Sequence, residues 1–492
     1  MIKTPILIVG AGPTGLMLSA QLHRYGAPHV IVDQKPGITK LSKALGVQAR
    51  TLEQYRQLGI IDKALGQGFV ANGARFIING QVKASVPLGE IGKGLSPYPY
   101  LYILEQSKNE ALLEDYILEH GGAVNWDSEV VELHKNGSGY RGTIKRGDGT
   151  SEEFECDYLV GCGGASSFVR HFFELSFEGE TNAQIFFVAD VTMDLNLDKQ
   201  GLLLVINNNE FLAFFPMSGE DRYRVIGVLP PTVDDLDNIS FDLLKNHIEE
   251  NFGFEGKITS HSWHSSYKVH HRIASNFRAG NGFLAGDAAH IHSPAGGQGM
   301  NTGLGDAANL GWKLAGVTKG WSSAKILQSY DEERRPFGKQ LVHTTDRAFS
   351  LIVSKNWGPR FFRTHILPIA LATILKFDVL RRLMFKTISQ TRIHYRASSQ
   401  SDGSRTNGIR SGDRFPWFDW PGGNSFDWLT EAGYVVLRFG GAKAVAIPDW
   451  SGPVLEFDVT SEAAKAAIAA GLPATGCVIV RPDMYIRHIS SS

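Results

Sequence analysis

The sequence predicts an α/β fold in which a buried parallel sheet is interrupted by an inserted antiparallel sheet and followed by helices and a second, small α/β unit. Three observations carry this prediction. An apolar run that leads into a glycine-rich turn occurs three times, at residues 5–15, 158–164 and 282–299. Residues from about 180 to 275 alternate as antiparallel strands do. A polar stretch rich in glycine and serine, residues 398–414, precedes the last part of the chain and is typical of a linker.

Composition and charge exclude several classes of function. The chain has 492 residues, more than one compact core holds, which suggests about three domains. Lysine and arginine (49) almost balance aspartate and glutamate (50), so no field of one sign is available to recruit nucleic acid. Cys156, Cys162 and Cys477 form no CxxC pair and no zinc spacing with histidines, so we expect neither disulfides nor a metal site. The N-terminus has no signal-peptide pattern, and we expect a cytoplasmic location.

One apolar run, His365 to Leu380, raises the question of a membrane. Pro368, Lys376 and Asp378 interrupt it, and it is shorter than the roughly 20 apolar residues that a spanning helix needs. Arginines flank it, which is typical of a helix lying in a membrane interface, but short apolar segments more often pack on the rest of the protein. We therefore predict no transmembrane span and favour a packed helix.

The first glycine-rich turn has the features of a dinucleotide-binding site. Pro5–Val9 is an apolar run typical of a buried parallel strand, and the sequence GAGPTG follows it at residues 10–15. The first glycine permits a tight turn, the second lets the main chain approach a pyrophosphate, and the third lets helix and strand pack. Asp33 closes the next strand, where a carboxylate can accept hydrogen bonds from a ribose. The alternative is a plain βαβ turn with a surface aspartate. The candidate residues are Gly10, Gly12, Pro13, Thr14, Gly15, Asp33 and Gln34.

A second turn favours FAD over NAD. Residues 286–303 have the sequence GDAAHIHSPAGGQGMNTG, directly after an apolar strand. Asp287 suits a ribityl or ribose hydroxyl, and the glycines of this stretch let main-chain amides meet a flat ring or a phosphate. A helix beginning near Met300 points its positive end at the part of a flavin that becomes anionic on reduction.

These residues resemble the class A flavoprotein aromatic hydroxylases of the para-hydroxybenzoate hydroxylase type, from Pro5 to about Phe337. The resemblance includes Arg50 in ALGVQARTLEQYRQLGI, Gln106 in ILEQSKNEALLEDY and the run DEERRPFG. It implies that Arg50 and Gln106 contact FAD, that Asp287 holds the ribityl chain, and that the second turn lies against the isoalloxazine ring. The cofactor candidates that it adds are Arg50, Gln106, Asp287, Pro294, Gly297, Gly299, Met300 and Asn301.

The resemblance also implies a reaction. NADPH or NADH reduces the FAD, a flavin C4a-hydroperoxide forms with O2, and its distal oxygen is transferred to an apolar phenol, polyketide or aromatic antibiotic. Because the flavin carries the chemistry, no catalytic side chain is assigned. Two alternatives use the same fold: Baeyer–Villiger-type oxygenation of a ketone and uncoupled NAD(P)H oxidation. A third, of another class, is an FAD protein that sequesters a hydrophobic ligand without turnover.

The predicted domains follow from these patterns. The Rossmann-like FAD-binding domain comprises residues 1–180 and 276–345, the inserted substrate-binding β-sheet domain comprises residues 181–275, and a helical segment comprises residues 346–397. Residues 398–492 resemble the thioredoxin-like C-terminal domain of the phenol-hydroxylase branch. Since that region has no CxxC motif, we expect it to serve stability or assembly, with a homodimer as one option.

One segment departs from the family pattern. In DYLVGCGGASSFVR, Gly163 stands where the family has an aspartate, and Ser166 stands where an arginine is common. The family uses this segment for FAD and for the nicotinamide donor, so both replacements bear on flavin reduction. We favour the interpretation that these two replacements are neutral sequence drift and that activity is retained, because a glycine keeps the turn and main-chain contacts can hold a pyrophosphate.

Candidate substrate residues lie on the inserted sheet and on the second turn. Aromatic residues on strands line a cavity in one interpretation and belong to the core in the other. His290 and His292 invite a general-base role, but histidines beside such a loop more often form hydrogen bonds within it. Cys162 is expected to be buried and inert. The substrate candidates are Phe214, Phe215, Met217, His292 and Pro294.

Overall fold

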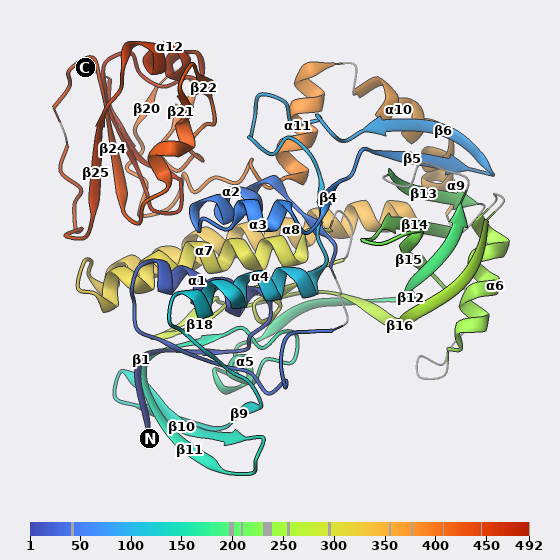
Figure 1. Cartoon of the computed structure of the whole chain (residues 1–492), viewed down its shortest axis with the longest axis horizontal. Coiled ribbons are helices and arrows are strands. Elements are labelled where there is room, and N and C mark those ends of the chain that lie inside the picture. Colours follow the sequence, from blue (N-terminus) through green and yellow to red (C-terminus); the bar gives the residue numbers. More distant parts are fainter. Residues whose placement is uncertain are drawn as a thin grey trace.

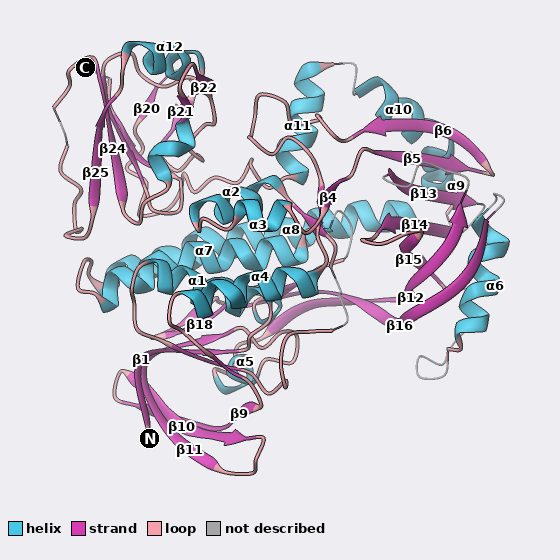
Figure 2. Ribbon diagram, in the orientation of Figure 1, coloured by secondary structure: helices cyan, strands magenta, loops and turns pink. Residues whose placement is uncertain are grey.

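The protein is described by a computed structural model in which a helical layer lies among three sheet-containing parts (Figure 1). Figure 2 shows these helices between the sheet that contains the N-terminus, a curved second sheet and the C-terminal unit. The structure describes residues 1–40, 44–195, 201–207, 210–229, 239–252, 256–293, 297–353, 356–374, 377–406, 408–443 and 445–491.

The first sheet brings the three predicted glycine-rich turns to one edge. Its order is β17-β18-β11-β1-β2-β8, with β10 and β9 continuing from β11 as an antiparallel extension. β1 runs parallel to β11, and β11 runs parallel to β18, so the turns that follow these three strands lie at the same edge. The strands are β1 (Ile2–Val9), β2 (Val30–Val32), β8 (Val124–Asn125), β9 (Ser128–Asn136), β10 (Gly139–Arg146), β11 (Ser151–Gly161), β17 (Arg278–Ala279) and β18 (Gly282–Leu284).

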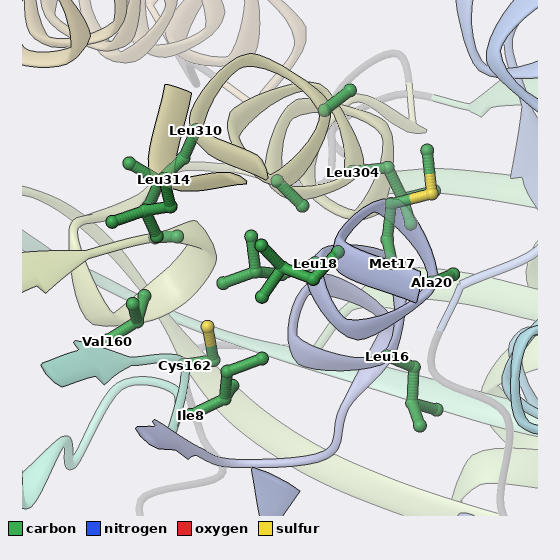
Figure 3. Packing of buried hydrophobic residues seen from close by; sticks show 14 of the residues in the cluster. Ile8, Leu16, Met17, Leu18, Ala20, Val160, Cys162, Leu304, Leu310 and Leu314 are labelled. Carbon is green, nitrogen blue, oxygen red and sulfur yellow. The ribbon is translucent and has the colours of Figure 1, made fainter. Parts of the chain in front are cut away.

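A layer of helices covers this sheet, formed by α1 (Pro13–Arg24), α4 (Gln106–Glu119) and α7 (Gly299–Thr318). Leu18 of α1 and Leu310 and Leu314 of α7 lie over Ile8 and Val160 of the strands (Figure 3). All five side chains are fully buried, and each contributes about 1.5–3 kcal/mol by leaving water. This core fixes the edge at which the turns meet.

The second sheet is built mainly from antiparallel strands of the inserted region, as expected. Its order is β19-β16-β12-β15-β14-β13-β5-β6. The hairpin β5–β6 comes from residues 73–87, outside the inserted region, and pairs in parallel with β13. The strands are β5 (Gly73–Ile78), β6 (Gln81–Pro87), β12 (Phe177–Leu195), β13 (Gly201–Asn207), β14 (Glu210–Pro216), β15 (Arg222–Val228), β16 (Gly256–Ala274) and β19 (His290–Ile291).

The two faces of the second sheet have different covers. α6 (Phe241–Phe252) packs on the outer face, where Leu244 and Ile248 join a core with alternate residues of the strands. α8 (Gln328–Val353) contacts β14 and β16 from the opposite side, and α10 (Leu367–Ile374) contacts β6 (Figure 1). The inner face therefore looks toward the helical layer.

The predicted helical segment contains the end of α8, then α9 (Trp357–Phe361), α10 and α11 (Asp378–Ile388). The described part of the run from His365 to Leu380 is thus divided among a π-helical segment (Phe362–Ile366), α10 and α11. Ile369 of α10 and Val379 of α11 are 69% and 77% exposed. Among the described residues, no helix is both long and apolar enough to cross a membrane.

The C-terminal unit has its own mixed sheet, of order β25-β24-β26-β27, with the α-helix α12 (Ser461–Ala469) and a short 3-10 helix (Ser425–Leu429). β24 (Tyr434–Phe439) is parallel to β25 (Val454–Asp458) and antiparallel to β26 (Gly476–Val480), which pairs with β27 (Ile486–Ile489). The expected linker at 398–414 is held at both ends, because Ser398 donates to Glu333 and the Gly412 N–H donates to Ile486 O.

Candidate active site

The three glycines of the first turn have distinct steric surroundings. Gly10 adopts φ 111°, and a Cβ atom on it would lie 2.5 Å from the carbonyl of Cys162 in the neighbouring turn. A Cβ on Gly15 would lie 1.8 Å from the oxygen of Gly10, whereas a Cβ on Gly12 would meet nothing within 4 Å. Gly10 and Gly15 are therefore required for packing, and Gly12 presents bare main chain to open space, as a pyrophosphate requires.

Helix α1 begins at this open space. Pro13 occupies the first helical position, and Gly12 precedes the helix without a side-chain cap, so no capping side chain occupies the N–H groups that a phosphate would use. Thr14 has a packing role. Its Oγ1 lies 2.4 Å and 2.2 Å from where Cβ atoms of Gly286 and Gly303 would be, so two glycines make room for it.

Asp33 lies next to the first turn at the end of β2. One carboxylate oxygen accepts the N–H of Ala11 at 2.6 Å, and the other accepts the N–H of Lys35 at 2.8 Å. Each oxygen keeps a second lone pair, which a ribose hydroxyl can use. The neighbouring Gln34 side chain is exposed.

The second turn supplies an exposed carboxylate and a helix N-terminus at the same edge. Asp287 follows β18 in a short 3-10 helix and is exposed, while the residues on either side of it are buried. The predicted helix near Met300 is confirmed, since α7 begins at Gly299. Gly297 is exposed and a Cβ on it would meet nothing within 4 Å, so this main chain can face a flat ring. Pro294 lies outside the described residues.

Asn301 holds the second turn in place rather than offering its side chain to a ligand. Its Oδ1 accepts hydrogen bonds from the Gln48 N–H and from Thr51 Oγ1, both at 2.8 Å. Its Nδ2 donates to the carbonyls of Gly46 and Gly297, both at 2.9 Å. These bonds tie α7 to α2 (Ala49–Gln57) and to β3 (Gly46–Val47), while Met300 beside it stays half-buried.

Within the described part of the chain, the side-chain contacts of Arg50 are with α2 and the C-terminal unit and not with the glycine-rich turns. Its guanidinium donates to Glu53 at 3.0 Å and to the carbonyl of Asp483 at 2.6 Å, and it lies 5.1 Å from the ring centre of Tyr485. Arg50 therefore faces the C-terminal unit. Gln106 begins α4, and its Nε2 donates to Glu110 at 2.9 Å.

The third turn contains the two departures from the family pattern. Gly163 and Ser166 are both exposed, and a Cβ on Gly163 would lie 3.8 Å from the nearest atom, so the site has room for a side chain. Arg170, which sequence reasoning did not single out, is buried and donates to the carbonyls of Ala165 and Ala288 at 2.6 and 3.1 Å. Arg170 thereby joins this turn to the turn that bears Asp287.

The model of the FAD binding domain family matches residues 3–345, the stretch that contains all three turns. The protein belongs to the FAD-dependent aromatic hydroxylases. It is therefore a flavin-dependent monooxygenase, an oxidoreductase that binds FAD.

Known proteins similar to this hydroxylase act on aromatic compounds. It is 32% identical over 416 residues to an uncharacterized aromatic compound monooxygenase of Bacillus subtilis, covering 84% of this chain and 80% of that one. It is 30% identical to the pentachlorophenol 4-monooxygenase of Sphingobium chlorophenolicum, covering 72% of this chain and 66% of that one. The solved structure of an anhydrotetracycline hydroxylase from Streptomyces rimosus matches with a TM-score of 0.78 and 26% identity, covering 99% and 95% of the two chains.

A buried network behind the second turn was missed by sequence reasoning. Asp306 of α7 accepts hydrogen bonds from the Gly286 N–H at 3.0 Å, from His290 Nε2 at 2.8 Å and from Arg334 Nε at 2.6 Å. Burial alone would raise the pKa of Asp306, but the Arg334 guanidinium and His290 lower it overall, so the carboxylate stays charged. The network positions the turn of the hydroxylase. In the sequence, Asp306 and Arg334 stand out only as charged residues within helical segments. Exposed helix surfaces show the same pattern, so it did not indicate a buried network.

Neither His292 nor Cys162 has the properties of a reactive group at neutral pH. Burial, and then the neighbouring His290, lower the pKa of His292 to about 4, so its ring is a weak base. His292 Nδ1 lies 2.8 Å from the carbonyl of Ser293, which fits a hydrogen bond within the loop. Burial raises the pKa of the Cys162 thiol, in agreement with the expected inert role.

The predicted substrate residues on the second sheet lie on different faces. Phe214 is fully buried in the core beneath α6, on the outer face. Phe215 points the other way and is half-buried, and Met217, two residues further, is buried with the hairpin β5–β6. Phe215 is therefore the one of these residues that lies half-buried on the inner face.

Proposed function

We propose that the protein uses NADPH or NADH to drive FAD-dependent hydroxylation of an apolar aromatic small molecule. The observation that carries this proposal is the common edge of β1, β11 and β18, where three glycine-rich turns meet. At this edge Gly12 faces open space and Asp287 is exposed. Both features suit a long dinucleotide. The N-terminus of α7 lies at the same edge, where its partial positive charge can stabilise an anionic group of the cofactor.

The residues at this edge fit FAD by their chemistry. Main-chain amides at the start of α1 would hold the pyrophosphate, Asp33 the ribose, Asp287 the ribityl chain, and the start of α7 the isoalloxazine. When bound, FAD supplies the redox chemistry, since it accepts a hydride from the nicotinamide donor and activates O2 for transfer to a ring. The proposed FAD contacts are Gly10, Gly12, Pro13, Thr14, Gly15, Asp33, Gln34, Gln106, Asp287, Gly297, Gly299 and Met300.

The third turn supports retained flavin reduction in spite of Gly163. Ser167 caps α5 (Phe168–Phe172) by accepting the N–H of Arg170, and Arg170 ties the turn to Ala288. The turn is thus held without the family's aspartate. We infer that the donor still reaches the flavin here, with an altered preference between NADPH and NADH.

For the substrate we propose a phenol, a polycyclic polyketide or an aromatic antibiotic. The names of the relatives, which specify pentachlorophenol and anhydrotetracycline, support this range. The inner face of the second sheet supports an apolar ring, because Phe215, Ile226 and Trp263 are half-buried on it. A dry cavity is needed, since water diverts activated oxygen to hydrogen peroxide.

We propose the predicted domain boundaries for this chain, with residues 398–492 as a thioredoxin-like domain that serves stability. The mixed sheet β25-β24-β26-β27 with α12 is consistent with that architecture. Cys477 is buried in β26, and burial raises the pKa of its thiol, so a thiol redox role is not supported.

The test is anaerobic stopped-flow reduction of the purified yellow protein by NADPH and by NADH, with and without a panel of phenols. We expect reduction that at least one phenol accelerates, followed in air by a product carrying one atom of labelled O2. If neither donor reduces the flavin with any ligand, the proposal of a self-sufficient monooxygenase fails.

A further inference from the structure

A buried ion pair lies on the inner face of the second sheet, where sequence reasoning expected apolar and aromatic side chains. Asp190 of β12 and Arg224 of β15 are direct cross-strand neighbours. Arg224 Nε and Nη2 donate to the two carboxylate oxygens of Asp190, both at 2.7 Å. The residues are 7% and 1% exposed, so both charges are removed from water.

The third guanidinium nitrogen, Nη1, lacks a hydrogen-bond acceptor among the described residues. Arg224 Nη1 is buried, and no atom of the described residues accepts a hydrogen bond from it. Because the carboxylate occupies the Nε–Nη2 edge, the N–H groups of Nη1 point away from Asp190. A buried donor left unsatisfied costs about 1–3 kcal/mol, and more when it is charged. A buried donor of this kind can pair with the oxygen of an ordered water molecule or of a ligand.

Two aromatic side chains flank the ion pair on the same face. The register places Phe215 beside Arg224 on one side and Trp263 beside Asp190 on the other. Trp263 lies under the guanidinium, with its ring centre 5.7 Å from the Arg224 Cζ. Phe215 and Trp263 are half-buried although Arg224 between them is covered. An apolar wall with one directed polar group is the usual form of a small-molecule site.

Tyr267 adds a second polar atom to the same wall. It lies on β16 opposite Phe186, two positions along the inner face from Trp263. Burial raises the pKa of Tyr267 to about 12, against the opposing effect of Arg224, so its hydroxyl stays protonated at neutral pH. The charges of Arg224 and Asp190 balance each other on this wall, and Arg222, two residues before Arg224 on β15, lies on the same face.

We propose that Arg224 Nη1 anchors the substrate by donating a hydrogen bond to an oxygen atom on the aromatic ring system, with Asp190 as the residue that positions the guanidinium. This inference rests on the proposed function and narrows the substrate class to aromatic compounds that carry a phenolic, carboxylate or carbonyl oxygen. Hydrocarbon rings of the same shape leave Nη1 unpaired and bind more weakly.

The test compares two ligands of equal shape, 1-naphthol and 1-methylnaphthalene, by the change they cause in the flavin absorbance of the holoprotein. The test variant is Asp190→Leu/Arg224→Met, because replacing both partners of a buried ion pair by apolar residues preserves folding better than removing one. We expect the wild type to prefer 1-naphthol about tenfold or more. In the double variant that preference disappears, while the affinity for 1-methylnaphthalene changes less than about threefold.

The control is Arg438→Met, which removes an ion pair with the exposed Asp458 at the surface of the C-terminal unit. Its ligand preference is expected to equal that of the wild type. Equal affinity of the wild type for the two ligands, no binding of either, or an unchanged preference in Asp190→Leu/Arg224→Met overturns the anchor. Failure of the proposed function has a different readout, since it is the absence of donor-driven flavin reduction and does not depend on the ratio of two affinities.

Discussion

Arg481 of the C-terminal unit donates hydrogen bonds to both carboxylate oxygens of Glu333 on α8, at 2.6 and 2.9 Å, and both side chains are fully buried. The same carboxylate accepts hydrogen bonds from Lys313, Asn309 and Ser398. Burial alone would raise the pKa of Glu333, but the Arg481 guanidinium and the Lys313 ammonium hold it below its usual range. The C-terminal unit is thus joined to the helical layer by a buried charge network.

Breaking this network on one side is expected to destabilise the protein strongly. Arg481→Met leaves Glu333 and Asp483 buried without their shared counter-charge, at a cost of about 3–5 kcal/mol. The midpoint of urea unfolding, followed by tryptophan fluorescence, measures the loss. The control is Arg438→Met, whose guanidinium is 27% exposed in a surface ion pair and whose loss costs about 1 kcal/mol or less. Equal shifts in the two variants would show that the buried network adds nothing.

Gly12 and Gly15 are expected to respond differently to a single methyl group. Gly12→Ala meets open space in an extended conformation, φ −77° and ψ −175°, so the stability of the apoprotein changes by less than about 0.5 kcal/mol. The same methyl group obstructs the pyrophosphate, so the Kd for FAD rises roughly tenfold or more. Isothermal titration of the Gly12→Ala apoprotein with FAD measures its Kd. Thermal unfolding of the apoproteins compares the stability of Gly12→Ala and Gly15→Ala.

Gly15→Ala is the counterpart because its Cβ would lie 1.8 Å from the Gly10 oxygen. We expect a loss of about 1–3 kcal/mol or more in the apoprotein itself. Unchanged FAD affinity in Gly12→Ala would mean that the pyrophosphate does not approach this residue.

Restoring an acid at position 163 is expected to speed flavin reduction. The nearest atoms to a Cβ on Gly163 are Val9 O at 3.8 Å and Ser167 Cα at 3.9 Å, which are ordinary contacts, so Gly163→Asp fits. A charge-assisted hydrogen bond gained there would accelerate reduction by NADPH or NADH roughly tenfold in stopped-flow traces. Gly164→Asp is the control, since Gly164 adopts φ 73° and an aspartate there is strained. An unchanged reduction rate in Gly163→Asp would mean that another feature limits hydride transfer.

His29 is expected to make stability fall at mildly acidic pH. Burial lowers its pKa to about 4, against a hydrogen bond from its Nδ1 to the Ala27 carbonyl that acts in the opposite direction. The unfolded chain takes up a proton near pH 6.5, whereas the folded ring does so only near pH 4. The neutral His29 ring therefore makes its full contribution to the free energy of unfolding above about pH 6.5. This contribution, on the order of 2 kcal/mol for a partly exposed ring, is lost as the pH falls toward 4.

The variant His29→Gln removes this titration, so its unfolding free energy should depend less on pH between 6.5 and 4 than that of the wild type. His134→Gln, at an exposed position on β9, serves as the control and should keep the wild-type slope. Parallel pH profiles for His29→Gln and the wild type would exclude His29 as the source.

Local patterns predicted the parts of the site that depend on short stretches of chain. The apolar runs before Gly10 and Gly286 became strands of one parallel sheet, on either side of β11, and the helix near Met300 begins at Gly299. In each case the signal is the spacing of apolar residues, or a glycine, within a stretch of about ten residues. Phe214 and Phe215 show the limit of such signals, since alternation says that they lie on opposite faces but not which face packs under α6.

The sequence by itself determined the cofactor class, the three turns and the family, because the chemistry of a phosphate-binding turn is written in consecutive residues. The tertiary structure alone decided that Arg50 faces the C-terminal unit, that Asp306 supports the second turn, and that Arg224 has one donor to spare. These depend on pairs far apart in the chain. Their geometry follows from strand register and helix packing, and a buried charge carries no local signal of the partner that it will meet.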